Sequence, residues 1–477
     1  MLFNSIPFFF FLAFVFAIYW IPFTKGRQHQ NYVLLVSSYV FYGWWDVRFL
    51  ALIFISSLCD YILGNLIHNS DTKRKRRTFL IFSLAVNLGI LFTFKYFNFF
   101  VSSFISSFSV ESSTDLFKII LPVGISFYTF QTLSYSIDIY RKRLSPAKSA
   151  IDFFTFVSFF PQLVAGPIER ATNFLPQISK ARVFSYPNAV IGCRYILFGM
   201  FKKVVISDNL SEIVAIIFKV DSVYSGLMNV VGVLFFALQI YCDFSGYSDI
   251  AIGTAKLFNI DLMVNFKRPY FAKSLKNFWS RWHISLSTWF RDYVYIPLGG
   301  SKVGPFRVYF NLFVTFLISG LWHGANWTFI IWGAIHGLFL VIEKLLSKTK
   351  MKVHSIFGWL ITMSIVLVAW VFFRAESLTH SLDYIKSMFT FEGEKGLAQQ
   401  LKGLLSSNSE ITIGHFALVL FTIALFFVVE LLIETKKGLR LFKFSAVIRY
   451  SCYVSLVFLI LMFGAFKSKA DFIYFQF

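Results

Sequence analysis

Charged residues are scarce in this sequence of 477 residues. They make up 14% of it, while hydrophobic residues make up 57%, and an ordinary soluble domain has about 25% charged residues. The mean hydropathy is +0.66. This composition excludes soluble globular, disordered and collagen-like proteins, and it indicates an integral membrane protein.

Acidic residues are few in comparison with basic ones. The 24 Asp and Glu against 45 Lys and Arg give a net charge of +21. In a soluble protein this excess would suggest nucleic acid as a partner. In a membrane protein it is typical of basic cytoplasmic loops beside anionic lipid, so we expect membrane lipid and no nucleic acid.

Cysteines and common catalytic motifs are also scarce. Cys59, Cys193, Cys242 and Cys452 form no CxxC pair and have no histidine at ligand spacing, which predicts small core residues rather than disulfides or a metal site. The sequence has no G-x-S-x-G, no glycine-rich phosphate loop and no H-E-x-x-H. Serine hydrolases, ATPases and metalloproteases are disfavoured, and we expect neither a metal nor a permanently bound cofactor.

What the chain does have is a series of apolar runs that suit a bilayer core of about 30 Å. They cover residues 5–23, 31–46, 49–67, 79–106, 118–139, 190–207, 225–249, 308–322, 325–345, 356–373, 412–433 and 450–467. The first run has no basic residue before it and no cleavage site after it, so we expect a retained span. We predict an all-α polytopic membrane protein with about 11–12 transmembrane helices in a single integral domain, residues 1–477.

Basic residues are concentrated in the loops on one side of these spans. They occur at Lys25 and Arg27, Lys73–Arg77, Arg141–Lys148, Lys256–Arg307, Lys344–Lys352 and Lys436–Arg449. The positive-inside rule places these loops in the cytoplasm. Both ends of the sequence and the loop 374–411 are then outside.

Two segments do not fit a simple alternation of spans and loops. Residues 153–169 are short and interrupted by Pro and Gly, while residues 256–307 are aromatic and basic yet bracketed by spans. Irregular backbone at membrane depth survives only when it is buried in protein or lines a water-filled cavity. We therefore expect both segments to form re-entrant or in-plane helices.

Ionisable residues inside apolar runs need a reason, because each costs about 2.5–3.5 kcal/mol to insert. Asp243 and Asp249 lie in the run QIYCDFSGYSD. We interpret them as buried hydrogen-bonding posts for Arg or Trp partners rather than as catalytic groups. Changes to Asn should then harm folding or assembly more than chemistry.

Two histidines have positions that favour chemistry. His323 is about 16 residues, or roughly 24 Å, into the span that begins near Arg307, and His283 comes from the adjoining in-plane segment, from which it could reach the same cavity. A neutral imidazole in a dry pocket can take a proton from an alcohol, and a second can orient it or stabilise an oxyanion. These residues permit O-acyl transfer without requiring it. His336 is expected in the core, and the other five histidines receive no role.

Four ordered strings carry a resemblance to a known family. They are FFPQLVAGPIER (159–170), YCDFSGYSDIAIG (241–253), NFWSRWHISLSTWFRDYVYIPLGG (277–300) and GLWHGANWTFIIWGAIHG (320–337). They resemble the signature blocks of the membrane-bound O-acyltransferase (MBOAT) family, in the bacterial branch of the alginate O-acetyltransferase subunit and, more distantly, the teichoic acid D-alanyl transferase. FYGWW (41–45) and DFIYFQF (471–477) also resemble that branch.

The resemblance implies a site and a reaction. His323 and His283 would be the catalytic residues, in a central tunnel through a ring of helices. The candidates to line that tunnel are Gln239, Asp243, Ser245, Asp249, Arg281, Trp282, Trp322 and Asn326. A cytoplasmic donor, acetyl-CoA, would supply an acetyl group to a separate extracytoplasmic SGNH-type esterase-like partner. That partner, working with polysaccharide biosynthesis machinery at the bacterial inner membrane, would O-acetylate a polysaccharide.

Two alternatives stay open at this point. A transporter or channel could line its path with the same Asp and His residues, although the sequence has no internal repeat of the kind that many transporters show. An inactive scaffold for a polysaccharide assembly complex is the other alternative, and the presence of both histidines argues against it.

Overall fold

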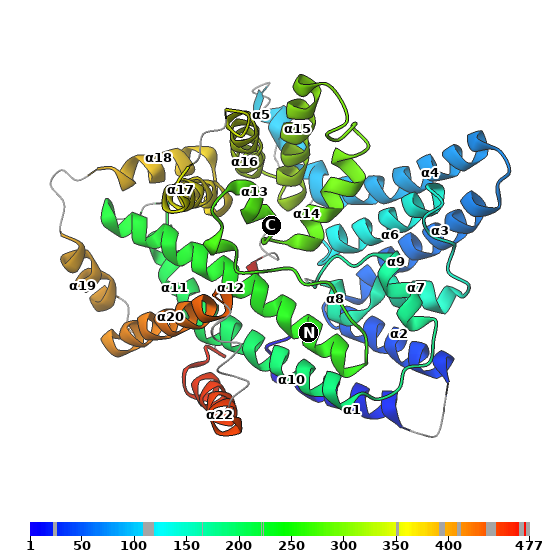
Figure 1. Ribbon diagram of the computed structural model, residues 1–477, viewed down its shortest axis with the longest axis horizontal. Helices are drawn as coiled ribbons and strands as arrows, with labels where there is room; N and C mark the ends of the chain where they lie inside the picture. Colours follow the sequence, from blue (N-terminus) through cyan, green and yellow to red (C-terminus); the bar gives the residue numbers. More distant parts are fainter. Residues whose placement is uncertain are drawn as a thin grey trace. The chain divides into compact units, whose positions relative to one another are not determined.

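The computed structural model is helical in every regular element that it describes (Figure 1). It describes residues 1–21, 26–107, 119–164, 166–220, 222, 224–349, 353–390, 396–407, 412–435, 445–466 and 472–473. Lys25, residues 436–444 of one predicted basic loop, and residues 471 and 474–477 of the DFIYFQF string lie outside this part of the chain.

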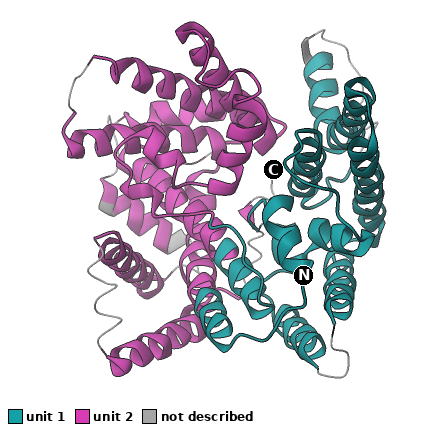
Figure 2. Cartoon of the chain, turned by 45° about the vertical axis from the view of Figure 1, so that its right-hand side comes forward, with its two compact units in different colours: residues 1–196, 248–264 teal, residues 197–247, 265–477 magenta. Residues whose placement is uncertain are grey.

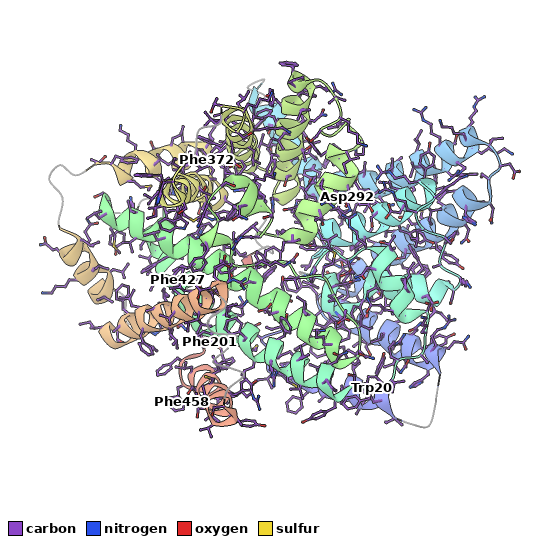
Figure 3. All side chains as sticks on the ribbon, viewed as in Figure 1. Trp20, Phe201, Asp292, Phe372, Phe427 and Phe458 are labelled. Carbon is purple, nitrogen blue, oxygen red and sulfur yellow. The ribbon has the colours of Figure 1, made fainter. Side chains whose placement is uncertain are left out.

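Within the described ranges, eight helical segments are long and apolar enough to cross a membrane. They are α3 (Leu50–Asn69), α4 (Lys73–Leu91) with α5 (Phe97–Ser107), α12 (Leu227–Leu257), α15 (Pro305–His323), α16 (Trp327–Leu346), α17 (Ser355–Arg374), α20 (Ile413–Glu434) and α22 (Ala446–Phe463). Phe427 on α20 and Phe458 on α22, both labelled in Figure 3, are 36% and 56% exposed, as suits a face toward lipid. The predicted all-α membrane fold is confirmed.

The four other predicted spans fall on shorter helices. These are α1 (Ile6–Trp20), α2 (Arg27–Gly43), α6 (Ile125–Tyr140) and α10 (Tyr186–Met200), with 15, 17, 16 and 15 residues. A bilayer core needs about 20 residues of straight helix. After α10 the chain continues through the π-helix η4 (Phe201–Ser207) into α11 (Asp208–Ile217), a stretch that carries Lys202 and Lys203.

The chain divides into two compact units (Figure 2). Unit 1 comprises residues 1–196 and 248–264, and unit 2 comprises residues 197–247 and 265–477. The single domain over residues 1–477 stays a prediction.

Unit 1 contains a buried polar network that joins three helices. Asp60 of α3 is fully buried. One carboxylate oxygen accepts hydrogen bonds from Ser83 of α4 and from Ser136 of α6, the latter at 2.7 Å, and the other accepts from the Asn87 side chain at 2.6 Å. A carboxylate in an apolar bundle is tolerated because these donors replace its water.

Both irregular segments form short helices, in keeping with the prediction that neither is a simple span. Residues 153–169 contribute to α7 (Ala150–Ser158) and α8 (Phe160–Leu163) in unit 1. In unit 2 the second segment forms η5 (Pro269–Phe271), α13 (Leu275–Trp279), α14 (Ile284–Phe290) and the π-helix η6 (Arg291–Tyr295). Their re-entrant position in the membrane stays a prediction.

The four cysteines are free, and one of them differs from the expected environment. Cys242 is buried, and Cys59 and Cys452 are half-buried. Cys193 is exposed, so its assignment to the core was wrong. It lies on α10, and an apolar side chain on a membrane helix can face lipid as readily as protein.

Candidate active site

His323 is positioned by the tight pairing of α15 and α16 in unit 2. The two helices run side by side (Figure 1) and approach closely at Gly320 and Gly333, where an added methyl group would overlap backbone of the facing helix. Small residues allow this approach between membrane helices. His323, three residues after Gly320, ends α15 and is only 3% exposed.

Aromatic rings enclose His323. Its ring centre lies 4.8 Å from that of Trp332 on α16 and 5.4 Å from that of Phe373 on α17, both near edge to face. The neighbouring Trp322 ring is 5.0 Å away. The imidazole of His323 is therefore enclosed by aromatic surface on several sides.

His283 stands at the start of α14 with an unusual backbone. It is the N-cap residue, with φ 43° and ψ 54°, and its side chain is fully buried. Asn265 holds the backbone just after it: the Asn265 carbonyl accepts from Ile284 N–H at 2.9 Å, and its side-chain oxygen accepts from Ser285 Oγ at 2.6 Å. Burial lowers the pKa of His283 to about 3, so this imidazole is neutral at ordinary pH.

The structure brings these two histidines together. Their ring centres are 6.5 Å apart in the interior of unit 2. Trp322 also borders His283, at 6.2 Å. Two buried imidazoles at this spacing can both reach one small reacting group, one to exchange a proton and the other to orient or stabilise it.

The remaining candidates from the in-plane segment and α16 have well-defined contacts. Trp282 is buried, with Phe266 and Trp370 rings at 5.0 Å each. Arg281 pairs with Glu434 at 2.9 Å. Asn326 is the N-cap of α16, and its side-chain oxygen accepts from Thr328 N–H at 3.1 Å.

The candidates on α12 are divided between the units. Gln239, Asp243 and Ser245 belong to unit 2, whereas Asp249 belongs to unit 1. Asp243 and Ser245 are buried, and Asp243 forms an ion pair with Lys203 at 2.7 Å. Its interpretation as a buried post fits this geometry, although the partner is a lysine and not Arg or Trp.

Sequence reasoning missed several residues around the site. Trp332 and Phe373 against His323 are ordinary aromatic residues of apolar helices, so no pattern distinguishes them. Lys203 could have been found, because it is an ionisable residue inside the apolar run 190–207. His336, expected in the core, is fully buried and accepts from Trp279 Nε1 at 3.4 Å.

A cavity of about 780 Å³ within unit 2 is lined by residues that lie close to the two histidines in the sequence. Its walls include Trp279, Ile284 and Ser319, and basic side chains line it at Lys276, Arg291 and Lys344. Ile284 directly follows His283. The Trp279 ring lies 5.6 Å from that of Trp332, the ring that packs on His323, so one ring lies between this wall of the cavity and that imidazole.

Comparison with known proteins decides the family. The model of the membrane-bound O-acyltransferase family, MBOAT, matches residues 78–379. This chain belongs to the MBOAT family. The MBOAT chain is therefore an O-acyltransferase and a multi-pass membrane protein. This membership argues against the transporter and scaffold alternatives.

Named relatives extend over most of the MBOAT chain. A protein of Pseudomonas putida named probable alginate O-acetylase AlgI is 40% identical over 431 residues, which cover 88% of this chain and 87% of that protein. The peptidoglycan O-acetyltransferase of Helicobacter pylori is 37% identical, covering 82% and 80%. The teichoic acid D-alanyltransferase of Streptococcus thermophilus is 29% identical over 49% of this chain and 59% of its own length.

Proposed function

We propose that this acyltransferase moves an acetyl group from cytoplasmic acetyl-CoA to a hydroxyl of an extracytoplasmic polysaccharide, by way of a separate SGNH-type partner at the bacterial inner membrane. The observation that carries the proposal is the pair of buried imidazoles, His283 and His323, 6.5 Å apart in an O-acyltransferase. Both belong to sequence blocks that resemble those of the family.

The chemistry assigned to the pair is a single acyl exchange. His323 takes the proton of an acceptor hydroxyl as its oxygen attacks the thioester carbonyl, and His283 orients that group or stabilises the oxyanion. The C–O bond forms, the C–S bond breaks, and the proton passes from His323 to the thiolate. The acceptor hydroxyl in this step belongs to the partner, which carries the acetyl ester outward; a sugar hydroxyl then attacks that ester carbonyl, so that the sugar ester forms and the partner's hydroxyl is regenerated.

The proposed donor is an anionic thioester with a long, flexible arm. The cavity of about 780 Å³ in unit 2 offers Lys276, Arg291 and Lys344 to the phosphates and its wall at Trp279 to the arm. These basic residues lie in stretches that the positive-inside rule assigns to the cytoplasm. This supports acetyl-CoA as the donor.

The proposed acceptor is a sugar hydroxyl of an extracytoplasmic polymer. The relatives in Pseudomonas putida and Helicobacter pylori carry the names of an alginate O-acetylase and a peptidoglycan O-acetyltransferase. Both named substrates are saccharide polymers, which supports this class of acceptor. The inner membrane and the SGNH-type partner follow from the resemblance to the alginate branch.

The test uses the purified protein in lipid nanodiscs with radiolabelled acetyl-CoA. Loss of label from the thioester, or its transfer to a supplied SGNH-type partner, is measured for wild type, His323→Ala and His283→Ala. We expect each variant to transfer about 10²–10⁴-fold more slowly, the range for removal of a general acid–base group.

Two controls separate chemistry from packing. His336→Ala removes an equally buried ring from the same unit, and His68→Ala changes an exposed histidine. His68→Ala should retain full transfer, and His336→Ala should lower thermal stability more than it lowers transfer. Full activity in His323→Ala would overturn the catalytic assignment, and turnover with another thioester but not with acetyl-CoA would overturn the donor.

A further inference from the structure

A buried ion triad lies in unit 2, apart from the histidine pair. The Lys203 ammonium is 2.7 Å from a carboxylate oxygen of Asp208 and 2.7 Å from one of Asp243. All three side chains are 2–3% exposed. Lys203 comes from η4, Asp208 begins α11 and Asp243 lies in α12. Buried ion pairs add little stability on balance. Stability alone therefore does not explain the triad, and its other contacts indicate its role.

Close helix packing makes the triad possible. Gly246 of α12 faces the Gly199 carbonyl, where an added methyl carbon would be only 2.8 Å from the oxygen. This contact brings α12 against the chain that leads into η4, the π-helix that contains Phe201 (Figure 3). The wider turn of a π-helix is often found at functional sites.

Asp243 uses its two oxygens for different partners. Oδ1 faces Lys203, and Oδ2 accepts a hydrogen bond from the backbone N–H of Ile473 at 2.7 Å. Phe472 and Ile473 are 0% and 2% exposed. We call these two residues the inner segment, because they are enclosed in unit 2, 230 positions away in sequence from the carboxylate that holds them.

The inner segment is one ring away from His283. Phe472 packs on Tyr247 at 4.6 Å and on Phe244 at 5.8 Å between ring centres. Phe244, next to Asp243 in the sequence, meets the His283 ring edge to face at 4.6 Å. Continuous contacts therefore run from Asp243 through the inner segment and Phe244 to the imidazole.

His283 has a particular need for such support. Its φ of 43° is in the left-handed region, which non-glycine residues adopt at a cost of about 1–3 kcal/mol and keep only when the surroundings enforce it. A ring on strained backbone loses its alignment when its packing loosens. Among the described residues with ring contacts to His283, Phe244 lies at 4.6 Å, compared with 6.2 Å for Trp322.

We propose that Asp243 is a positioning residue for acyl transfer: through the N–H of Ile473 it fixes the inner segment, which presses Phe244 against His283. Lys203, which also pairs with Asp208, holds one oxygen of the Asp243 carboxylate so that the second oxygen faces Ile473. The effect on transfer rests on the proposed function, whereas the anchoring of the inner segment does not.

The decisive comparison is made at Ile473, where backbone and side chain can be changed separately. Ile473→Pro removes the N–H, and Ile473→Ala keeps it. In the nanodisc transfer assay we expect Ile473→Pro and Asp243→Ala each to lower kcat about 10–100-fold, the size of effect that a misplacement of about 1 Å can have, with little change in KM for the donor. Ile473→Ala should lose much less, and Asp243→Asn, which keeps an acceptor oxygen, should fall between Asp243→Ala and wild type.

The double variant Asp243→Ala with Ile473→Pro tests whether the two groups act together. We expect it to be no slower than the worse single variant, because both remove one interaction. Multiplied losses, or wild-type kcat in Ile473→Pro, would overturn the proposal. Asp46→Asn, in a pair with the exposed Arg48 and in unit 1, is the neutral control.

A second measurement does not depend on turnover. Hydrogen–deuterium exchange followed by mass spectrometry should show faster exchange in Asp243→Ala than in wild type for peptides that contain residues 472–473 and for those around His283, with most other peptides unchanged. Unchanged exchange at residues 472–473 would overturn the anchoring. If wild type transfers nothing but the exchange changes as expected, the proposed function fails and the anchoring stands.

Discussion

The His283 side chain has an environment that ties its protonation to stability. Burial lowers its pKa from 6.5 to about 3. Between these values the unfolded chain binds a proton that the folded chain does not, so the free energy of unfolding falls as the pH drops below about 6.5. This contribution is constant above that pH.

We therefore predict a pH-dependent difference between wild type and His283→Asn. At pH 5 the buried imidazole lowers the stability of wild type by about 2 kcal/mol relative to pH 8, a penalty that the variant lacks. Thermal unfolding in nanodiscs at the two pH values measures it. Equal losses in both proteins would show that His283 is accessible to protons in the folded state.

The sequence motifs predicted the histidine pair, but they did not predict the residues that pack against it. His323 was identifiable from its depth in a span and His283 from its place in an aromatic segment. The contact of Asp243 with Ile473 joins positions 230 apart, and no local pattern encodes such a distance. The left-handed backbone of His283 is equally hidden, because non-glycine residues rarely adopt it.

At the scale of elements, the α15–α16 pair sets the place of His323. The Gly320 Cα faces Gly333, and a methyl group built on Gly320 would lie 3.3 Å from the Gly333 Cα and overlap the Phe329 carbonyl. The helices would have to separate. Because His323 is only three residues further along α15, that separation moves the imidazole as well.

We predict that Gly320→Ala lowers both stability and transfer. Overpacking typically costs about 1–3 kcal/mol, and the displaced His323 should slow transfer by more than the loss of folded protein explains. Gly89→Ala in α4 is the matched control, since nothing lies within 4 Å of its added methyl group; alanine there should be neutral or slightly stabilising. Wild-type transfer in Gly320→Ala would show that the helix pair tolerates separation.

The polar network of unit 1 gives a second test at this scale. Asp60→Ala would leave the Ser83, Asn87 and Ser136 groups without their common acceptor, which costs about 1–3 kcal/mol. We expect a lower unfolding temperature, and full transfer by the protein that stays folded. Asp71→Asn, at an exposed position, should behave as wild type. An unchanged unfolding temperature in Asp60→Ala would contradict the role of the network.

The elements themselves were predictable where hydropathy is strong and length sufficient. α3, α15, α16, α17, α20 and α22 fall within a few residues of predicted spans, whereas α12 continues eight residues beyond the predicted end at residue 249. Four predicted spans correspond to helices that are shorter than predicted, namely α1, α2, α6 and α10. Hydropathy is averaged over a window, so it does not show where polar residues such as Gln30 and Asn31 allow a helix to pack against protein. The π-helices η2 (Phe92–Tyr96), η4 and η6 leave no hydrophobic signature.

At the scale of the whole molecule, charge determines orientation. The excess of basic residues in alternate loops of a chain with net charge +21 predicts which loops are cytoplasmic. The proposed donor cavity depends on this orientation, because Lys276, Arg291 and Lys344 must face the compartment that contains the donor.

We predict that a cysteine at position 74 is cytoplasmic and one at position 382 is external. Arg74 lies in the first turn of α4, within the basic stretch Lys73–Arg77, and Leu382 of α18 (Leu378–Met388) is 54% exposed in the loop expected outside. In a Cys193→Ser background, a membrane-impermeant maleimide should label Leu382→Cys on intact spheroplasts and Arg74→Cys only after permeabilisation. The reverse labelling would show that the membrane orientation is opposite to the predicted one. The basic cavity would then face the outside, and a cytoplasmic thioester would be excluded as its ligand.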